Sequence, residues 1–366
     1  MSRKRIVVKI GSSSLTNASG EIDEAKMTDH IQAIAALRKA NHEVILVSSG
    51  AVAAGFRSLG YTARPVTIKG KQAAAAVGQS LLLQSYYSKL SVYDMVPAQI
   101  LLTRGDFSNR DRYKNAFSTI LELLERGVLP IINENDTVAI DELTFGDNDM
   151  LSALVSGFIH ADQLIILTDI NGIYDANPQK NPDAKRIDHL ESVTETMLQN
   201  TDHTGSTLGT GGMKSKLEAA KTAMSLGVPV FVGQGTGAHK FFDVLAGKGD
   251  GTYLSNQKLG SINTKKQWIG FHSESAGALY VDQGAEEAIL YNGRSLLPAG
   301  IFKVKGTFSR GDVVEVFGMN GLLGRGEVNY SSNEVKQAIQ KRGNMKHTIQ
   351  PMQEVIHRNR WVEIKQ

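Results

Sequence analysis

Lys9 is an unusual residue because it lies inside a run of apolar residues, Ile6–Ile10, that has the composition of a β-strand. Burying an ammonium there is costly unless the side chain leaves the strand at its carboxyl end and meets an anion. The next residues, Gly11–Ser14, supply hydroxyl groups and backbone amides that can approach a phosphate closely. The alternative is a lysine that simply reaches solvent. The spacing is not that of a P-loop.

A second group of basic residues lies in the glycine-rich segment Gly209–Lys216, which opens a helix expected over Leu217–Ser225. Backbone amides and the positive end of the helix dipole meet at such a helix start and form a site for anions. Lys214 and Lys216 would disfavour this end of a helix, but a bound polyphosphate would compensate them. The alternative is an ordinary glycine-rich loop with solvated lysines.

Polar side chains follow other expected strands. Asn133–Asp136 comes after Val128–Ile132, and Phe145–Asp149 precedes a helix expected over Met150–Ile159. A substrate with an ammonium and a carboxylate would suit this mixture of amides and carboxylates, although turns and helix caps use the same residues. Thr168–Pro178 could hold a nucleotide base or ribose, or merely close a loop.

Composition narrows the chemistry further. The chain has no cysteine, which excludes disulfides, thiolate metal sites and cysteine nucleophiles and fits a reducing compartment. Its 9 histidines are scattered, without metal-ligand spacing or a Ser/His/Asp arrangement. No segment approaches the roughly 20 apolar residues of a membrane span, and no signal peptide is recognisable. We therefore expect a cytoplasmic protein that uses oxygen, nitrogen and backbone groups.

Strands and helices must alternate to position these residues. The expected strands are continuous apolar runs, which predicts a mostly parallel sheet sandwiched between helices, an α/β fold. Ligands in such sheets bind at the carboxyl ends of the strands. The expected strands are Ile6–Ile10, Glu43–Val47, Met95–Leu102, Val128–Ile132, Gln163–Leu167 and Val228–Val232, and the expected helices are Glu24–Ala40, Ile68–Leu90, Tyr113–Glu125, Met150–Ile159 and Lys216–Ser225.

The pattern changes after Leu254. Residues 255–267 are polar and predict a linker, and residues 268–366 contain short β-like segments separated by turns, without alternating helices. This predicts a first domain over 1–254 and a small β-rich barrel over 268–366. Residues 255–366 carry 15 Lys and Arg against 10 Asp and Glu, so the basic excess belongs to the second domain.

Taken in order, these motifs resemble the amino acid kinase family, and the resemblance covers nearly the whole chain. The basic C-terminal part resembles a PUA domain through Leu296–Ile301 and Phe308–Asp312. The loop that follows the first expected strand reads Gly-Ser-Ser at Gly11–Ser13, where the family has Gly-Thr-Ser. Serine keeps the hydroxyl group that threonine has at the second of these positions. The motifs that carry the family resemblance are Val7–Ser13, Ser48–Gly55, Leu102–Asp106, Ile132–Asp136, Phe145–Leu154, Leu167–Tyr174 and Gly209–Lys216.

The resemblance implies roles for individual residues. Lys9 and Lys216 match the two lysines that contact phosphate, and Asp149 matches the carboxylate that orients them. The implied substrate-binding residues are Ser49, Asn133, Asp136, Asp147 and Asn148. The implied ATP-binding residues are Lys9, Gly11, Ser12, Thr168, Asp169, Thr210, Gly211, Gly212, Met213, Lys214, Ser215 and Lys216.

The implied activity is the ATP-dependent phosphorylation of the side-chain carboxylate of L-glutamate to L-glutamyl 5-phosphate, the first step of proline biosynthesis. That carboxylate, with a reference pKa near 4.3, is already anionic at pH 7, so no general base is required. Catalysis is then positioning and electrostatics. Mg²⁺ would be held by phosphates and water, without dedicated protein ligands.

Other functions remain open from the sequence. A sibling kinase that acts on another carboxylate or on a nucleotide would share Lys9 and the glycine loops, but we expect it to lack the Asn133–Asp136 and Gly146–Asp149 pair in this form. An RNA-binding protein is the alternative of a different class, although the modest charge of the second domain predicts only weak, salt-sensitive RNA affinity. The family resemblance also implies a homo-oligomer that proline inhibits.

Overall fold

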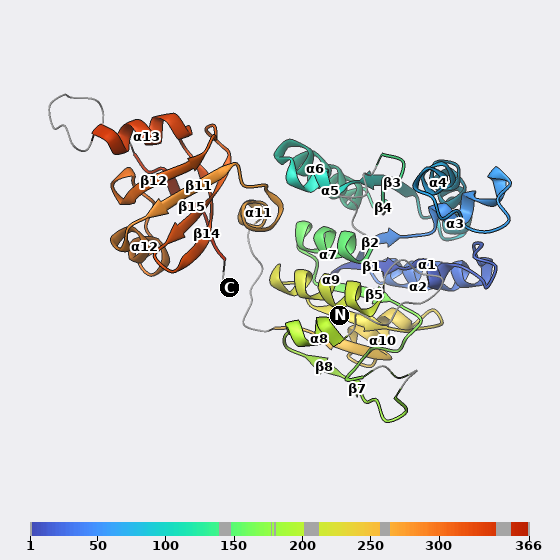
Figure 1. Ribbon diagram of the computed structural model, residues 1–366. Coiled ribbons are helices and arrows are strands. Elements are labelled where there is room, and N and C mark those ends of the chain that lie inside the picture. Colours follow the sequence, from blue (N-terminus) through green and yellow to red (C-terminus); the bar gives the residue numbers. More distant parts are fainter. Residues whose placement is uncertain are drawn as a thin grey trace. The chain divides into compact units, whose positions relative to one another are not determined.

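The structure is a computed structural model that describes residues 2–138, 148–176, 178, 181–200, 212–256, 264–341 and 353–364. The chain divides into two compact units (Figure 1). The first unit comprises Met1–Asp106 and Lys114–Ser261, and the second comprises Phe107–Tyr113 and Ile262–Gln366. The limits 1–254, 255–267 and 268–366 for domains and linker remain a prediction.

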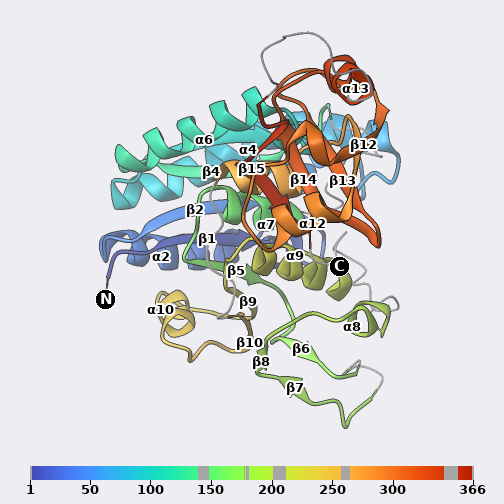
Figure 2. The ribbon, with the colours of Figure 1, turned by 90° about the vertical axis from the view of Figure 1, so that its left-hand side faces the viewer.

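The first unit is built on an eight-stranded sheet with the strand order β3-β4-β2-β1-β5-β9-β10-β8. All neighbouring strands from β3 to β9 run parallel, and only β10 is antiparallel to β9. Figure 2 shows these strands stacked from β4 to β8. The bounds are β1 Arg5–Ile10, β2 Glu43–Ser48, β3 Pro97–Leu102, β4 Leu129–Glu134, β5 Gln163–Leu167, β8 His189–Leu190, β9 Val230–Gly233 and β10 Gly251–Leu254, and a separate ribbon pairs β6 Ile173–Tyr174 with β7 Arg186–Ile187.

Continuous apolar strands bury both faces of this sheet, as the sequence predicts. Ile6, Val7 and Val8 are all fully buried although successive side chains of a strand point to opposite faces. Helices α2, α4 and α10 contribute to the core cluster that includes β1 and β2, and α7 and α9 pack against each other and against strands β1, β5 and β9. The α/β architecture with a mostly parallel sheet is therefore confirmed.

Helices α2 and α4 of the first unit begin at residues whose side chains cap them. The side chain of Asp23 accepts hydrogen bonds from two amides at the start of α2, and Thr67 accepts one at the start of α4. Gly78 lets α4 approach α3 closely, since a Cβ there would lie 1.8 Å from the carbonyl oxygen of Ala51. The bounds are α1 Ser12–Leu15, α2 Glu24–Lys39, α3 Ala51–Gly55, α4 Ile68–Leu90, α5 Arg104–Ser108, α6 Arg110–Glu125, α7 Asn148–Phe158, α8 Glu195–Asn200, α9 Met213–Ser225 and α10 Lys240–Leu245.

Two helices start earlier than the sequence pattern indicates. Helix α9 begins at Met213 rather than near Lys216, directly after Gly212. Helix α7 begins at Asn148 rather than at Met150, so Asp149 lies in its first turn, where the helix dipole favours a negative charge. Both changes move polar residues of the predicted site from loops into rigid first turns.

The second unit is a five-stranded sheet with the order β12-β11-β13-β14-β15 and its own apolar core, which confirms the β-rich prediction. Helices α12 and α13 were not expected. Ser331 and Glu334 cap α13 reciprocally, which is a capping box. The bounds are β11 Gly277–Val281, α12 Gln283–Leu290, β12 Ile301–Gly306, β13 Val313–Gly318, β14 Gly321–Val328, α13 Ser332–Lys341 and β15 Ile356–Glu363, while α11 Thr264–Gln267 lies inside the predicted linker.

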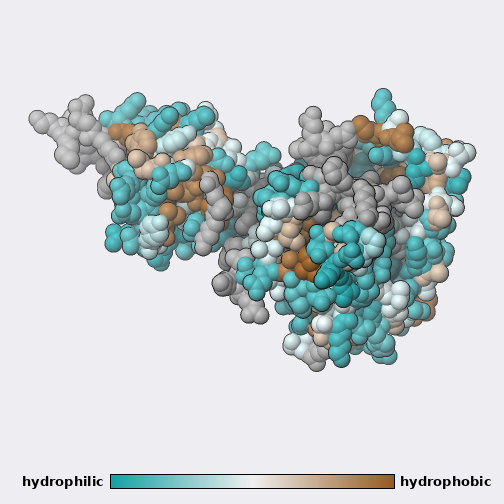
Figure 3. All heavy atoms as spheres, turned by 60° about the horizontal axis from the view of Figure 1, so that its bottom comes forward, coloured by the Kyte–Doolittle hydropathy of each residue, from teal (hydrophilic) through white to brown (hydrophobic). Residues whose placement is uncertain are grey.

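The described helices differ in length or in apolar character from membrane spans. Among the described helices, none has the length and the apolar character needed to cross a bilayer. On the face shown in Figure 3, hydrophobic residues form small separate patches among hydrophilic ones.

Candidate active site

The segments that follow four neighbouring strands of the large sheet, and that carry several predicted site residues, lie at one edge of that sheet. Strands β1, β2, β4 and β5 are parallel neighbours, so their carboxyl ends lie side by side. The loops that follow them start at Gly11, Ser49, Asn135 and Thr168. The topology thus brings together segments that are far apart in the sequence.

Asp149 lies between the two lysines that the sequence singles out. The Nζ atom of Lys9 forms an ion pair with Oδ1 of Asp149, and the Nζ atom of Lys216 lies 3.0 Å from Oδ2. The hydroxyl of Ser215 donates to the same Oδ2 at 3.1 Å. Asp149 is fully buried, and the exposed fractions of Lys9 and Lys216 are only 3% and 8%. The reading of Lys9 as a lysine in open solvent is therefore wrong.

The electrostatics of this triad keep the carboxylate charged. Burial alone would raise the pKa of Asp149, but the charges and hydrogen bonds of Lys9 and Lys216 hold that pKa well below its ordinary value. The three side chains together carry a net charge of about +1 when all are ionised. An anion at this edge of the sheet would therefore meet a buried positive centre whose geometry is already fixed.

The loop after β1 leaves room for the lysine. A Cβ atom at Gly11 would lie 3.1 Å from the Nζ atom of Lys9, closer than most side-chain contacts. Gly212, the residue before α9, has no side chain that could occupy the start of that helix beside Lys216. Both features fit a polyphosphate that binds between the two loops.

A second group of buried polar side chains surrounds Asn148. Its Nδ2 atom donates to the carbonyl of Ser48 at 2.8 Å, to the hydroxyl of Ser49 at 3.0 Å and to Oδ1 of Asn133 at 2.8 Å. The Nδ2 atom of Asn133 in turn donates to Gln79 at 2.8 Å. The ends of β2 and β4 and the start of α7 are therefore joined by one hydrogen-bond network.

Asp136 follows the end of β4 by two residues. It is partly buried, and burial raises its pKa to about 6. A cation that approaches this carboxyl group would lower its pKa again, because an ion pair stabilises the charged form. Asp147, which the sequence also assigns to substrate binding, lies outside the described residues.

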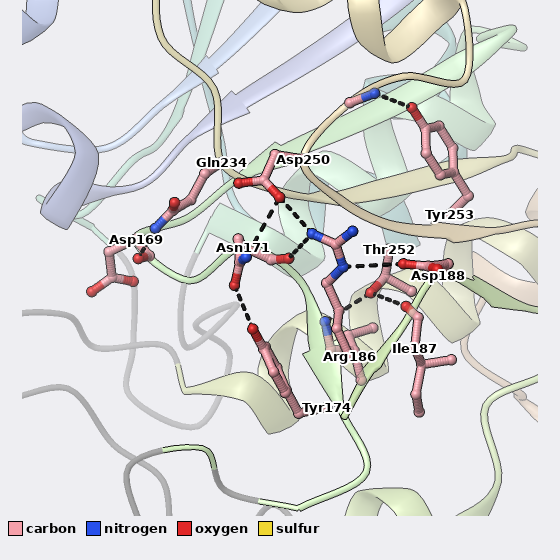
Figure 4. Close-up of polar contacts among 12 residues, drawn as sticks. Asp169, Asn171, Tyr174, Arg186, Ile187, Asp188, Gln234, Asp250, Thr252 and Tyr253 are labelled. Carbon is pink, nitrogen blue, oxygen red and sulfur yellow. Dashed lines mark hydrogen bonds and ion pairs between the residues drawn. The ribbon is translucent and has the colours of Figure 1, made fainter. Parts of the chain in front are cut away.

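The loop after β5 is fixed from several sides (Figure 4). Thr168 is buried and its hydroxyl donates to Asp169 at 3.1 Å, while the side-chain amide of Gln234 donates to the backbone carbonyl of Asp169. Further along the loop, Asn171 contacts Asp250, which pairs with Arg186 at 2.5 Å. Hydrogen bonds and an ion pair therefore hold this loop in place, and its assignment to a nucleotide base or ribose stays a prediction.

The structure thus brings together most of the predicted site. Asp149 contacts both lysines that it was expected to orient, and Ser49, Asn133 and Asn148 contact one another, while Thr210 and Gly211 lie outside the described residues. The roles assigned to these residues remain predictions. Sequence reasoning missed Gln79, which is partly buried, and His30 and Lys240, which are buried. No sequence motif marks them.

Known proteins match the chain along its whole length. The family model described as "Amino acid kinase family" matches residues 4–234. The chain belongs to the amino acid kinase family. A curated relative from Bacillus subtilis (strain 168) named "Glutamate 5-kinase 1" is 61% identical and covers 100% of both chains. Another from Oceanobacillus iheyensis, named "Glutamate 5-kinase", is 59% identical over 100% of this chain and 98% of the relative.

Two further comparisons concern the fold. The PUA domain model matches residues 277–349, which supports the resemblance of the second unit to that domain. The structure of "Carbamate kinase from Giardia lamblia bound to AMP-PNP" covers 70% of this chain and 99% of its own, with a TM-score of 0.52 and 17% identity. At this identity the likeness shows the kinase fold alone.

Proposed function

We propose that this protein phosphorylates the side-chain carboxylate of L-glutamate with ATP and yields L-glutamyl 5-phosphate, the first step of proline biosynthesis. The observation that carries the proposal is the buried Lys9, Asp149 and Lys216 triad at the carboxyl edge of the sheet. The names of the full-length relatives support glutamate as the acceptor.

The triad suits transfer between two anions. The attacking carboxylate and the γ-phosphate of ATP repel each other, so the barrier depends on positive charge held in place between them. Lys9 and Lys216 supply that charge, and Asp149 fixes both ammonium groups before the substrates arrive. The glutamate carboxylate needs no deprotonation at pH 7, so no side chain has to act as a general base.

The network around Asn148 suits recognition of the amino acid. Asp136 would pair with the α-ammonium of glutamate, and Ser49 and Asn148 would hold its polar groups near the ends of β2 and β4. Asn133 would keep Asn148 in position through their 2.8 Å hydrogen bond. Asp147 is included by family resemblance.

ATP would lie across the loops after β1 and β5 and at the start of α9. Gly11, Ser12 and Gly212 would surround the phosphates, with Met213, Lys214 and Ser215 in the first turn of α9. Thr168 and Asp169 would contact the nucleoside. Mg²⁺ would be held largely by the phosphates and water, where it offsets their charge.

The remaining proposals concern partners and location. Exposed apolar residues on and near α4, including Tyr87, Val92 and Val96, support a homo-oligomer. In the second unit, Tyr280 stacks on Phe317, and this pair supports weak RNA binding because bases stack on aromatic rings. Feedback inhibition by proline is proposed from family resemblance, and a cytoplasmic location is proposed from the sequence, in which no signal peptide is recognisable.

The test is ADP release from ATP in the presence of each candidate acceptor. L-glutamate is compared with acetylglutamate, aspartate, carbamate and a nucleotide, with hydroxylamine added to trap an acyl phosphate as the hydroxamate. We expect glutamate alone to give both ADP and hydroxamate, and proline to suppress both. ADP release with another acceptor and none with glutamate would overturn the proposal. The same assay with RNA examines the second unit.

A further inference from the structure

The short turn α1, which follows Lys9 and Gly11, is held from one side by helix α2. The Nζ atom of Lys26 donates to the carbonyl oxygens of Ser13 at 3.2 Å and of Thr16 at 2.7 Å. The Nε2 atom of His30 lies 3.0 Å from the carbonyl oxygen of Ser14. In a helical turn the carbonyls point one way and the amides the other. These contacts therefore determine where the amides of the loop point.

His30 itself is held by a buried lysine. Its Nδ1 atom lies 2.8 Å from the Nζ atom of Lys240, and the exposed fractions of the two residues are 6% and 3%. An ammonium group has only donors, so Nδ1 must accept this hydrogen bond. Burial and the charge of Lys240 lower the pKa of His30 to about 4, so the ring is neutral at pH 7. Its remaining hydrogen lies on Nε2, which donates to Ser14.

Lys240 is in turn fixed at the start of α10. Its Nζ atom lies 2.5 Å from Oδ2 of Asp29, and Oδ1 of Asp29 accepts a hydrogen bond from the amide of Gly237 at 2.7 Å. Gly235 packs against the Lys240 side chain, since a Cβ there would lie 3.0 Å from the lysine Cβ. The lysine therefore has little freedom to move, and neither does the histidine ring that it binds.

The contacts form a continuous path to the reacting groups. The path runs from Lys240 through His30 to the carbonyl of Ser14, whose amide donates to the carbonyl of Gly11 at 3.1 Å. Gly11 lies directly against the Nζ atom of Lys9. Both ring nitrogens of His30 therefore have partners, and one partner belongs to the loop that follows Lys9.

We propose that His30, whose tautomer is set by Lys240, is a positioning residue that holds the loop Gly11–Ser14 in the conformation that binds the phosphates of ATP. The inference rests on the proposed function, in which this loop contacts ATP. His30 touches neither substrate in the proposal. Its effect should therefore appear in the KM for ATP and leave the KM for glutamate nearly unchanged.

A matched pair of substitutions separates the two ring nitrogens. His30→Gln places an amide N–H near Nε2 and keeps the donor to Ser14, but it loses the acceptor for Lys240. His30→Asn places an amide oxygen near Nδ1 and keeps the acceptor for Lys240, but it loses the donor to Ser14. We expect His30→Asn to raise the KM for ATP about five- to tenfold, the effect of about one hydrogen bond. His30→Gln should change it less than about twofold.

If His30 only stabilised the fold, His30→Gln would be the more damaging substitution of the two, because it leaves the buried Lys240 with one acceptor fewer. Thermal melts of both variants therefore accompany the kinetics, and binding of a non-hydrolysable ATP analogue is measured directly. The inference is overturned if the KM for ATP is equal in the two variants or higher in His30→Gln. Glutamate-dependent ADP release by the unaltered protein tests the proposed function separately, so the two failures cannot be confused.

Lys240→Met supplies a second, independent test in case His30→Asn does not fold. Without Lys240, Nδ1 can take the ring hydrogen, which leaves Nε2 without a donor for Ser14. At pH 8 we expect the KM for ATP to rise about fivefold or more and the KM for glutamate to stay within about twofold. Lys248→Met, which removes an exposed lysine from the same region, is the control. An unchanged KM for ATP in Lys240→Met would overturn the inference.

Discussion

Asp149→Asn removes one charge from the centre of the site and leaves its shape nearly intact. The fully buried carboxylate pairs with both Lys9 and Lys216, so the substitution leaves two ammonium groups close together without their counter-charge. Breaking a buried ion pair by removing one partner costs about 3–5 kcal/mol. For a domain of this size, each kcal/mol lowers Tm by about 2–4 °C, so we expect a loss of about 6–20 °C.

The same substitution should lower kcat more than it affects binding. Once released from the carboxylate, each lysine can drift from the position that the transferred phosphoryl group needs, and the loss of one such contact costs about 10²–10³ in rate. The KM for ATP should not rise, because freed ammonium groups can still pair with phosphates in the ground state. Bound ATP should restore part of the lost Tm, since its phosphates replace the missing negative charge.

The assay combines melts with and without ATP and glutamate-dependent ADP release over a range of both substrates. Asp243→Asn is the matched control, because this aspartate of α10 is exposed and the same change there should leave Tm and kcat unaltered. An Asp149→Asn protein with unchanged Tm and kcat would refute the electrostatic reasoning. A lower Tm with full kcat would show that Asp149 only stabilises the fold.

Three more outcomes follow from the site. Lys9→Ala and Lys216→Ala should each lower kcat about 10²–10³-fold with a small effect on the KM for glutamate, and an unchanged kcat would remove that lysine from the mechanism. Asp136, whose pKa is raised to about 6, must be ionised to pair with the α-ammonium, so the KM for glutamate should fall as pH rises through about 6 and level off near 7, and Asp136→Ala should raise that KM and abolish this profile. A chain truncated after Leu254 should melt cooperatively and retain glutamate-dependent ADP release, whereas a folded but inactive truncation would show that the second unit completes the site.

The sequence alone was sufficient for the outline of the site. Lys9 is conspicuous in an apolar strand, and parallel strands bring their carboxyl ends to one edge, so a phosphate site near Lys9 could be predicted. The role of Asp149 depended on family resemblance, since an aspartate at a helix start is ordinarily a cap. Only the structure shows that its two oxygens face different lysines, which lie 207 positions apart.

The His30 and Lys240 pair could not be found from sequence. The two residues are 210 positions apart, and a histidine on the buried face of an amphipathic helix is indistinguishable by pattern from one that merely fills the core. Lys240 follows a polar loop, where a lysine normally reaches solvent. Burial of this lysine depends on the packing of α10 against α2, a long-range contact that no local periodicity encodes.

Lys240 and Lys9 are both buried lysines of the first unit, but their charges differ in how far carboxylates neutralise them. Lys240 pairs with Asp29 and donates to His30. Its charge is therefore neutralised within the protein, and its contacts hold the His30 ring in place. Lys9 shares Asp149 with Lys216, so this group of three keeps about one positive charge in excess. Such an excess of positive charge attracts an approaching polyphosphate. A buried lysine that has a carboxylate of its own, such as Lys240, can therefore only hold other groups in place. Buried lysines that share one carboxylate, such as Lys9 and Lys216, keep positive charge that can act on a substrate.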